Sequence, residues 1–260
     1  MRDLRGDILA WGLGLAVLAA AIVYVFSSIR HDPSLKTFDA MIQGFSPVIR
    51  AFLGGDDIPS VTTFEGFIRL EFLNYLPLLL AIFAIIEGTA AIALEEQRRT
   101  IDLLMAQPLR RWRVVVEKFA ALLVAAYAIA SLAGLGLVVA TRFEPVEAPW
   151  YRMMLATANA VPPALVVGAL SLLGSCALRR RLHAVIAAAS FLAASFFLNI
   201  LGQIAAPIQP WRELSIFYAY SKSHPMTGDL ITDHTLWLLA ATAILLAASI
   251  FAFHRKGLGL

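Results

Sequence analysis

The residues of this chain that could do chemistry are few and scattered. Its five histidines stand at the ends of apolar runs or between them: His31, His183, His224, His234 and His254. No pair of histidines or cysteines has a metal-ligand spacing. The single cysteine, Cys176, excludes an internal disulfide and lies near the end of an apolar run, as a small buried residue would. Because there is also no G-x-x-x-x-G-K-[ST] phosphate loop and no Ser/His/Asp set with a common location, the sequence predicts no catalytic residue, no metal site and no cofactor in this chain.

Three polar residues within apolar runs are the remaining candidates, as parts of a transport pathway. Glu87 is an ionisable group in a segment apolar enough for a membrane, where such groups are costly and often functional. It also lies about two helical turns before a charged segment, so it could reach the interface or pair with a basic neighbour, which is the structural role we favour. Asn199 and Gln203 stand one helical turn apart and could face a pathway or bond between helices.

The most densely charged stretch of the chain runs from Leu94 to Lys118, between two long apolar runs. Its first part is predicted to form an amphipathic helix, because charged and apolar residues then fall on different flanks. The charged flank consists of Glu95, Arg98, Arg99 and Asp102, and the apolar flank of Leu94, Ile101, Leu104 and Met105. Pro108 disfavours helical geometry at Gln107 and ends the helix. A short amphipathic helix between two spans, ringed by positive charge, is typical of a docking element on a cytoplasmic face.

The same stretch resembles the first cytoplasmic loop of type-2 ABC exporter permeases, where an E-E-x-x-G-T-[IL]-[DE]-L-L-L-[AS]-x-P-[VI]-S-R pattern leads into the third span. The matching positions are Glu95, Glu96, Thr100, Ile101, Asp102, Leu103, Leu104, Ala106, Gln107, Pro108 and Arg111. Arg99 stands where the family usually has glycine and Arg110 where it often has serine, and both add charge to the surface. AFLGG near residue 51, FEGF near residue 64 and LSIFYAY near residue 214 extend the resemblance more loosely.

The resemblance implies a partner for this helix. A separate ABC ATP-binding subunit, which carries ATP and Mg, would dock on it. The implied contact residues are Glu95, Glu96, Arg98, Arg99, Thr100, Ile101, Asp102, Leu103, Leu104, Met105, Ala106, Gln107 and Pro108. A second permease subunit, either another copy or a related chain, would complete the assembly.

Composition places these residues in a membrane protein. Of the 260 residues, 60% are hydrophobic and 15% are charged. A soluble domain averages about 45–50% apolar and about 25% charged. The net charge of +3 does not indicate nucleic acid, because the basic residues gather at the ends of apolar runs. The chain is therefore predicted to be an all-α, polytopic integral membrane protein.

The apolar runs predict one transmembrane domain over residues 1–260, since about 20 apolar helical residues cross a bilayer core. The expected spans are residues 8–28, 70–94, 114–141, 154–178, 183–203 and 236–253, with a coupling loop at 95–113 and outer segments at 29–69 and 204–235. Thr62 and Glu65 match a capping box and predict a helix start there. The helix would continue through Pro77, whose freed carbonyl a neighbour could satisfy. Proline, tryptophan and aromatic residues in 204–235 resemble the re-entrant outer half-helices of the family.

The distribution of basic residues predicts that both termini are cytoplasmic. Short inner segments would hold thirteen of the 21 basic residues: two at the N-terminus, six in 98–118, three in 179–181 and two at the C-terminus. The other eight are spread over longer outer segments. A multi-pass protein of the bacterial plasma membrane is expected.

Together these features predict a membrane-spanning permease subunit of an ABC exporter that is not itself an enzyme. Two other classes stay open. An ion-gradient-driven secondary transporter is disfavoured because no internal repeat or pair of broken helices is evident. An intramembrane enzyme is disfavoured because the apolar runs hold no cluster of histidines or acids. The substrate cannot be inferred from the sequence.

Overall fold

Six helical stretches are long and apolar enough to cross a membrane, in a computed structural model that describes residues 4–53, 60–93, 111–144, 146, 148–178, 180–223, 225–226 and 232–255. They are Leu4–Ile29, Phe64–Ala90, Arg111–Phe143, Trp150–Ala177, Arg181–Ile204 and Thr232–Arg255. Across these ranges every regular element is a helix. The predicted all-α, six-helix membrane architecture is therefore confirmed, and each of the six stretches overlaps one of the predicted apolar runs.

The bundle is organised around α10 (Val161–Ala177), the second half of the fourth stretch. It packs against α5 (Leu76–Ala90), α8 (Arg111–Phe143), α11 (Arg181–Ile204) and α13 (Thr232–Arg255), with α9 (Trp150–Asn159) leading into it. Glycines permit this close packing. A Cβ at Gly88 would lie 2.8 Å from the Ser171 side chain and 2.9 Å from the Gly168 carbonyl oxygen. In lipid no hydrophobic effect drives helices together, so their association depends on close van der Waals packing, which small residues permit.

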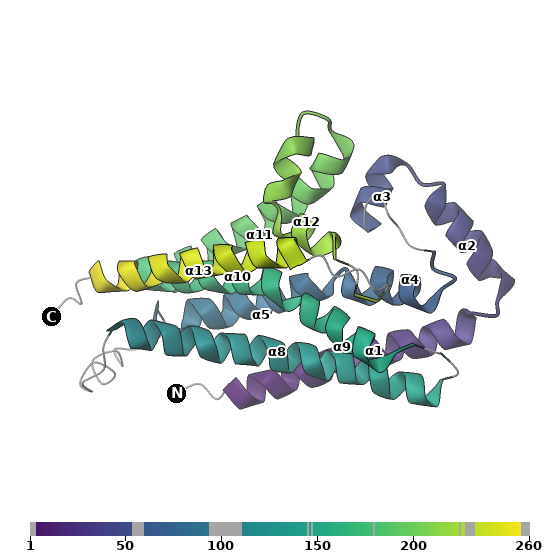
Figure 1. The fold of residues 1–260 in the computed structure, drawn as a ribbon, viewed down its shortest axis with the longest axis horizontal. Helices are drawn as coiled ribbons and strands as arrows, with labels where there is room; N and C mark the ends of the chain where they lie inside the picture. The colour runs from purple at the N-terminus through teal and green to yellow at the C-terminus, as the bar shows by residue number, and fades with distance from the viewer. Residues whose placement is uncertain are drawn as a thin grey trace.

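The first helix, α1 (Leu4–Ile29), lies along α8 on the outside of the bundle. Gly136 of α8 is in such close contact with α1 that an added Cβ would collide with the backbone of Ala16. At the far end of the pair, the Ser27 hydroxyl donates a hydrogen bond to the Glu144 carboxylate. Figure 1 shows the start of α1, the start of α8 and the end of α13 at one end of the bundle.

The second stretch is broken into three pieces rather than one straight helix. α4 (Phe64–Ile68) is followed by a π-helical turn, η1 (Arg69–Leu73), and then by α5. Thr63, not Thr62, caps α4, because its hydroxyl accepts from the Gly66 amide at 3.2 Å while the Thr62 hydroxyl bonds Ser60 at 2.7 Å. The predicted helix start was thus wrong by one residue. Pro77 lies in the first turn of α5, where the lack of an N–H costs little.

Tyr220 satisfies the carbonyl that Pro77 leaves without its helical donor. The α-helical donor for the Leu73 oxygen would be residue 77, which as proline has no N–H. The Tyr220 hydroxyl donates to that oxygen instead, at 2.8 Å. The predicted rescue by a neighbour is confirmed, and its donor comes from a residue 147 positions away. Burial raises the pKa of the Tyr220 phenol, which keeps the phenol protonated and able to donate.

Tyr220→Phe is expected to destabilise the protein by about 1–3 kcal/mol, because it leaves the Leu73 carbonyl unsatisfied. The raised pKa adds a pH dependence. The stabilisation by the protonated phenol is fully present below the ordinary tyrosine pKa of about 10 and is lost as the pH rises above it. Thermal unfolding of wild type and variant between pH 7 and 11 should therefore converge at the alkaline end. Tyr218→Phe is the control, and equal stability of wild type and Tyr220→Phe at pH 7 would contradict the assignment.

The remaining elements gather at the end of the bundle opposite the two termini (Figure 1). After α1 come α2 (Pro33–Gln43) and α3 (Pro47–Leu53), and after α11 come the 3₁₀ helix η2 (Gln209–Leu214) and α12 (Ile216–Ser221). α12 packs against α10, α11 and α13 and buries Phe217 against Phe196, with ring centroids 5.4 Å apart. η2 and α12 lie within the 204–235 segment, and the prediction that this segment forms re-entrant outer half-helices stays a prediction.

Candidate functional site

The helix predicted at 95–108, with all its implied docking residues, lies outside the described residues, but both of its flanks are described. Figure 1 shows the end of α5 and the start of α8 at the same end of the bundle as the two termini. The described residues stop at Ala93 and resume at Arg111. On the second flank, Arg113 forms an exposed ion pair with Glu117 at 2.7 Å. The first flank is held by a buried polar network.

Ser175 of α10 fixes the last residues before this segment. Its hydroxyl oxygen accepts hydrogen bonds from the Ile92 amide at 3.1 Å and the Ala93 amide at 2.8 Å. The same hydroxyl donates to the Thr89 carbonyl at 3.2 Å. α5 ends at Ala90, so these are backbone groups that helix termination would otherwise leave without partners. One fully buried side chain from another helix therefore caps the end of α5.

Arg181, at the start of α11, holds the same helix end from a second direction. Its Nη2 donates to the Ile86 carbonyl at 3.0 Å, and its Nε lies 3.4 Å from the Thr89 hydroxyl. A cation is favourable there because the partial charge at a helix C-terminus is negative. The end of α5 is thus joined to α10 and α11 directly before the charged segment begins.

The sequence pattern does not reveal this network. In the sequence Arg181 is one of three consecutive basic residues, and Ser175 resembles the other small residues of its apolar run. The available signal was indirect: a serine within an apolar run that ends shortly before a basic turn. Neither residue type nor spacing names a partner 82 or 83 positions away, as Ala93 and Ile92 are from Ser175.

Glu87 lies in the last turn of α5, half-buried, and follows the residue whose carbonyl Arg181 binds. Gly88, beside it, is in contact with α10 at Ser171. Glu87 is therefore near the α5 terminus that is joined to α10 and α11, rather than in the middle of a span. That Glu87 has a structural role rather than a role in a transport pathway stays a prediction.

Asn199 and Gln203 lie near the other end of the bundle and bond to protein groups. The Asn199 side-chain oxygen accepts from Arg212 Nε of η2 at 3.0 Å, and Gln203 Nε2 donates to the Asn199 carbonyl at 3.1 Å. Gly202 is also close to Arg212, whose Cβ would be 2.7 Å from an added Cβ. These contacts fasten η2 to α11. The structure thus separates Glu87 from the Asn199–Gln203 pair, and a common pathway role for the three stays a prediction.

A comparison with family models decides the class of this helical membrane protein. The model described as ABC-2 family transporter protein matches residues 9–258, which covers nearly all of the chain. The chain belongs to the ABC-2 transporter family. Comparison with curated proteins gives no match. As an ABC-2 protein, the chain is a permease component of an ABC transporter, a membrane transport part and not a catalytic one.

For an ABC-2 permease with a structural Glu87, Glu87→Gln should retain most transport and change expression or thermal stability only modestly. The amide keeps the size and hydrogen-bonding capacity of the carboxylate but removes its charge. Transport in membrane vesicles and the yield of assembled transporter are the measurements, with Glu71→Gln, an exposed acid of η1, as the control. Loss of transport with assembly intact would instead assign Glu87 to substrate or proton handling.

Proposed function

We propose that this chain is the membrane-spanning subunit of an ABC exporter, driven by a separate ATP-binding subunit that docks on residues 95–108. Membership of the ABC-2 family over residues 9–258 carries the proposal, because such a permease requires an ATPase from elsewhere. The transporter contains a second permease subunit, and ATP and Mg bind in the ATPase partner. The cargo leaves the cytoplasm across the plasma membrane.

The hydrogen bonds from α10 and α11 to the C-terminal end of α5 support the proposed route of coupling. A docked helix that moves with the ATPase pulls on Ala93, which is bonded to Ser175 of α10 at 2.8 Å. The same α5 end is bonded to Arg181 of α11. A displacement at the docking helix is therefore passed to two further spans rather than absorbed by a loose connection. α10 contacts four other long helices, so its tilt redistributes packing throughout the bundle.

Cysteine crosslinking tests the docking proposal. Cysteines are placed singly at positions 97–107 after replacement of Cys176, which is buried and the only native thiol. Crosslinks from several of these positions to the co-purified ATPase, with a pattern that changes on ATP addition, are the expected result. An amphipathic helix that lies on the lipid surface gives no crosslink under any nucleotide condition.

Labelling of exposed positions tests the proposed orientation, with both termini cytoplasmic. A cysteine at Lys222, which is exposed near α12, should react with an impermeant thiol reagent added to intact cells. A cysteine at the exposed Arg180, in the turn before α11, should react only after the membrane is opened. The reverse pattern would invert the topology and place the 95–108 segment on the wrong side for an ATPase. Ser223 is unsuitable as a probe because it is only 5% exposed.

A further inference from the structure

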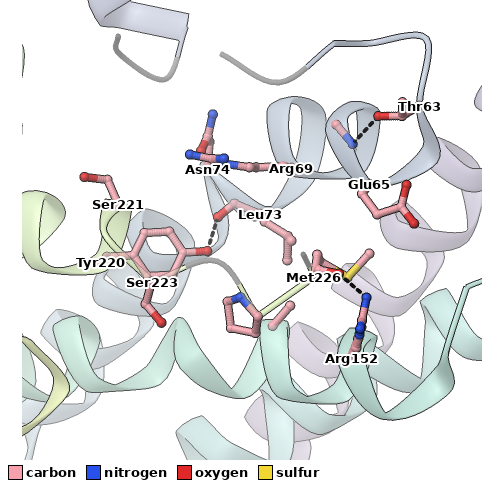
Figure 2. Close-up of a pocket in the computed structure, with 13 residues that line it drawn as sticks. Thr63, Glu65, Arg69, Leu73, Asn74, Arg152, Tyr220, Ser221, Ser223 and Met226 are labelled. Carbon is pink, nitrogen blue, oxygen red and sulfur yellow. Dashed lines mark hydrogen bonds between the residues drawn. The ribbon is translucent and has the colours of Figure 1, made fainter. Parts of the chain in front are cut away.

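A half-open cavity of about 370 Å³ lies at the end of the bundle opposite the termini, enclosed by α4, η1, α9, α12 and the segment that follows α12. Ligand sites in proteins typically measure about 300–1,000 Å³. Figure 2 shows polar side chains from these elements around the hollow. The charged groups among its lining are Glu65, Arg69 and Arg152. The described lining of the cavity thus carries charges of both signs.

Arg152 has donors to spare. Among the described residues, its guanidinium donates one hydrogen bond, from Nη1 to the Met226 carbonyl at 3.4 Å, and forms no ion pair with a carboxylate. A guanidinium has five N–H donors in a fork that matches phosphate and carboxylate oxygens. Arg69 brings a second guanidinium to the same cavity from η1. The cavity is therefore suited to an oxyanion.

Ser223 adds a second, independent sign of a ligand. It lines the cavity, is only 5% exposed, and its buried hydroxyl has no hydrogen-bond partner in the described part of the chain. Buried polar groups are nearly always bonded, and an exception indicates a water, ion or ligand. This hydroxyl is therefore available to a polar group of a ligand in the cavity.

Glu65 limits the kind of anion. It lies on the same cavity, yet its carboxylate forms no ion pair or side-chain hydrogen bond among the described residues. A purely anionic ligand would be repelled by this carboxylate. A ligand that also has an ammonium group would bind it favourably, so the cavity matches a zwitterion whose anionic part meets Arg152.

The flanking aromatic residues place the cavity at a membrane interface. Trp150 and Tyr151 directly precede Arg152 and are 60% and 52% exposed. Exposed tryptophan and tyrosine at the start of a span gather at the headgroup level of a bilayer. At this level of the bilayer, lipid headgroups are the most concentrated zwitterions that carry a phosphate.

The π-helical turn explains how a cluster of polar side chains forms on one side of an apolar helical stretch. Arg69 and Asn74 are five residues apart and both line the cavity, and the Asn74 amide bonds the Arg69 carbonyl at 3.0 Å. In an α-helix, at about 100° per residue, they would point in widely different directions. π-helical turns are rare and occur frequently at functional sites.

We propose that this cavity binds a zwitterionic phosphate ester of phosphoethanolamine type, with the phosphate toward Arg152, the ammonium toward Glu65 and the Ser223 hydroxyl available to another polar group of the ligand. The source is a membrane lipid headgroup or the corresponding soluble ester. The assignment concerns this chain's own residues and does not depend on ATPase docking.

Lipid retention by the purified full-length chain tests the proposal. The chain is exchanged into detergent with equal amounts of phosphatidylethanolamine and phosphatidylglycerol, and the lipid that remains bound is quantified by native mass spectrometry. Wild type should retain phosphatidylethanolamine preferentially. Arg152→Gln and Ser223→Ala should each lower its affinity, by about tenfold or more for the arginine. Glu65→Gln should remove the preference between the two lipids.

Controls separate binding from folding. Arg142→Gln changes an exposed arginine at the end of α8, outside the cavity lining, and should leave retention unchanged. Arg152→Lys keeps the charge and should retain most of the lipid. No protein group among the described residues bonds the Ser223 hydroxyl, so Ser223→Ala should not lower the thermal stability of the lipid-free protein. Competition by soluble glycerophosphoethanolamine identifies a free ester as the ligand, and its failure to compete identifies a lipid. Unchanged retention in Arg152→Gln would overturn the proposal, and an unchanged preference in Glu65→Gln would overturn its zwitterion assignment.

Discussion

Leu104→Asp is expected to release the ATP-binding subunit from the permease. Leu104 belongs to the predicted apolar flank of the 95–108 segment, and burial of a leucine in a docking cleft is worth about 1.5–3 kcal/mol. The substitution removes this burial free energy and adds the cost of desolvating a carboxylate, so the affinity of the ATP-binding subunit for the permease should fall by well over tenfold. Co-purification of the ATPase with the tagged permease measures the loss.

The matched control is Arg98→Ala, on the predicted charged flank of the same segment. Rim charges contribute little to affinity, typically about 0–1 kcal/mol, and act mainly through salt dependence. This variant should therefore keep the ATPase bound and change only the salt concentration at which the complex dissociates. If Leu104→Asp co-purifies with the ATPase as wild type does, the apolar flank faces lipid and the docking proposal fails.

Ser175→Ala is expected to detach the end of α5 from α10. The substitution removes one acceptor and one donor and leaves the amides of Ile92 and Ala93 and the carbonyl of Thr89 without this partner. An unsatisfied buried polar group costs about 1–3 kcal/mol, so the thermal unfolding midpoint should fall clearly. The start of the docking segment is then no longer fixed. Binding of the ATPase must order it, which costs conformational entropy, so the affinity should fall.

Ser171→Ala is the control on the same helix, one turn earlier. Ser171 is equally buried, but among the described residues its hydroxyl bonds only the Val167 carbonyl of its own helix, at 2.8 Å. Its removal should affect stability little and leave ATPase binding unchanged. Equal behaviour of the two serine variants would mean that the Ser175 contacts do not position the docking segment.

The sequence by itself determined the class and the number of spans. A bilayer fixes how many apolar residues a helix needs, so six runs of sufficient length are readable without any knowledge of their packing. Pro77 was equally readable as a residue that frees a carbonyl, because the missing N–H is a property of proline alone. The charged segment from Leu94 to Lys118 indicated the family through local residue order, which the match over residues 9–258 confirms at the family level.

Only the tertiary structure decided which distant groups satisfy these local requirements. Tyr220 bonds Leu73 across 147 residues, and Ser175 bonds Ile92 across 83. A helical pattern records which face is apolar, but not which neighbour lies against it, since many helices present the same small and apolar residues. The capping error has the same cause: Thr62 and Thr63 both suit a cap, and only the structure shows that the Thr63 hydroxyl accepts from the Gly66 amide. The cavity of Glu65, Arg152 and Ser223 likewise exists only because three separate segments meet, which no local spacing encodes.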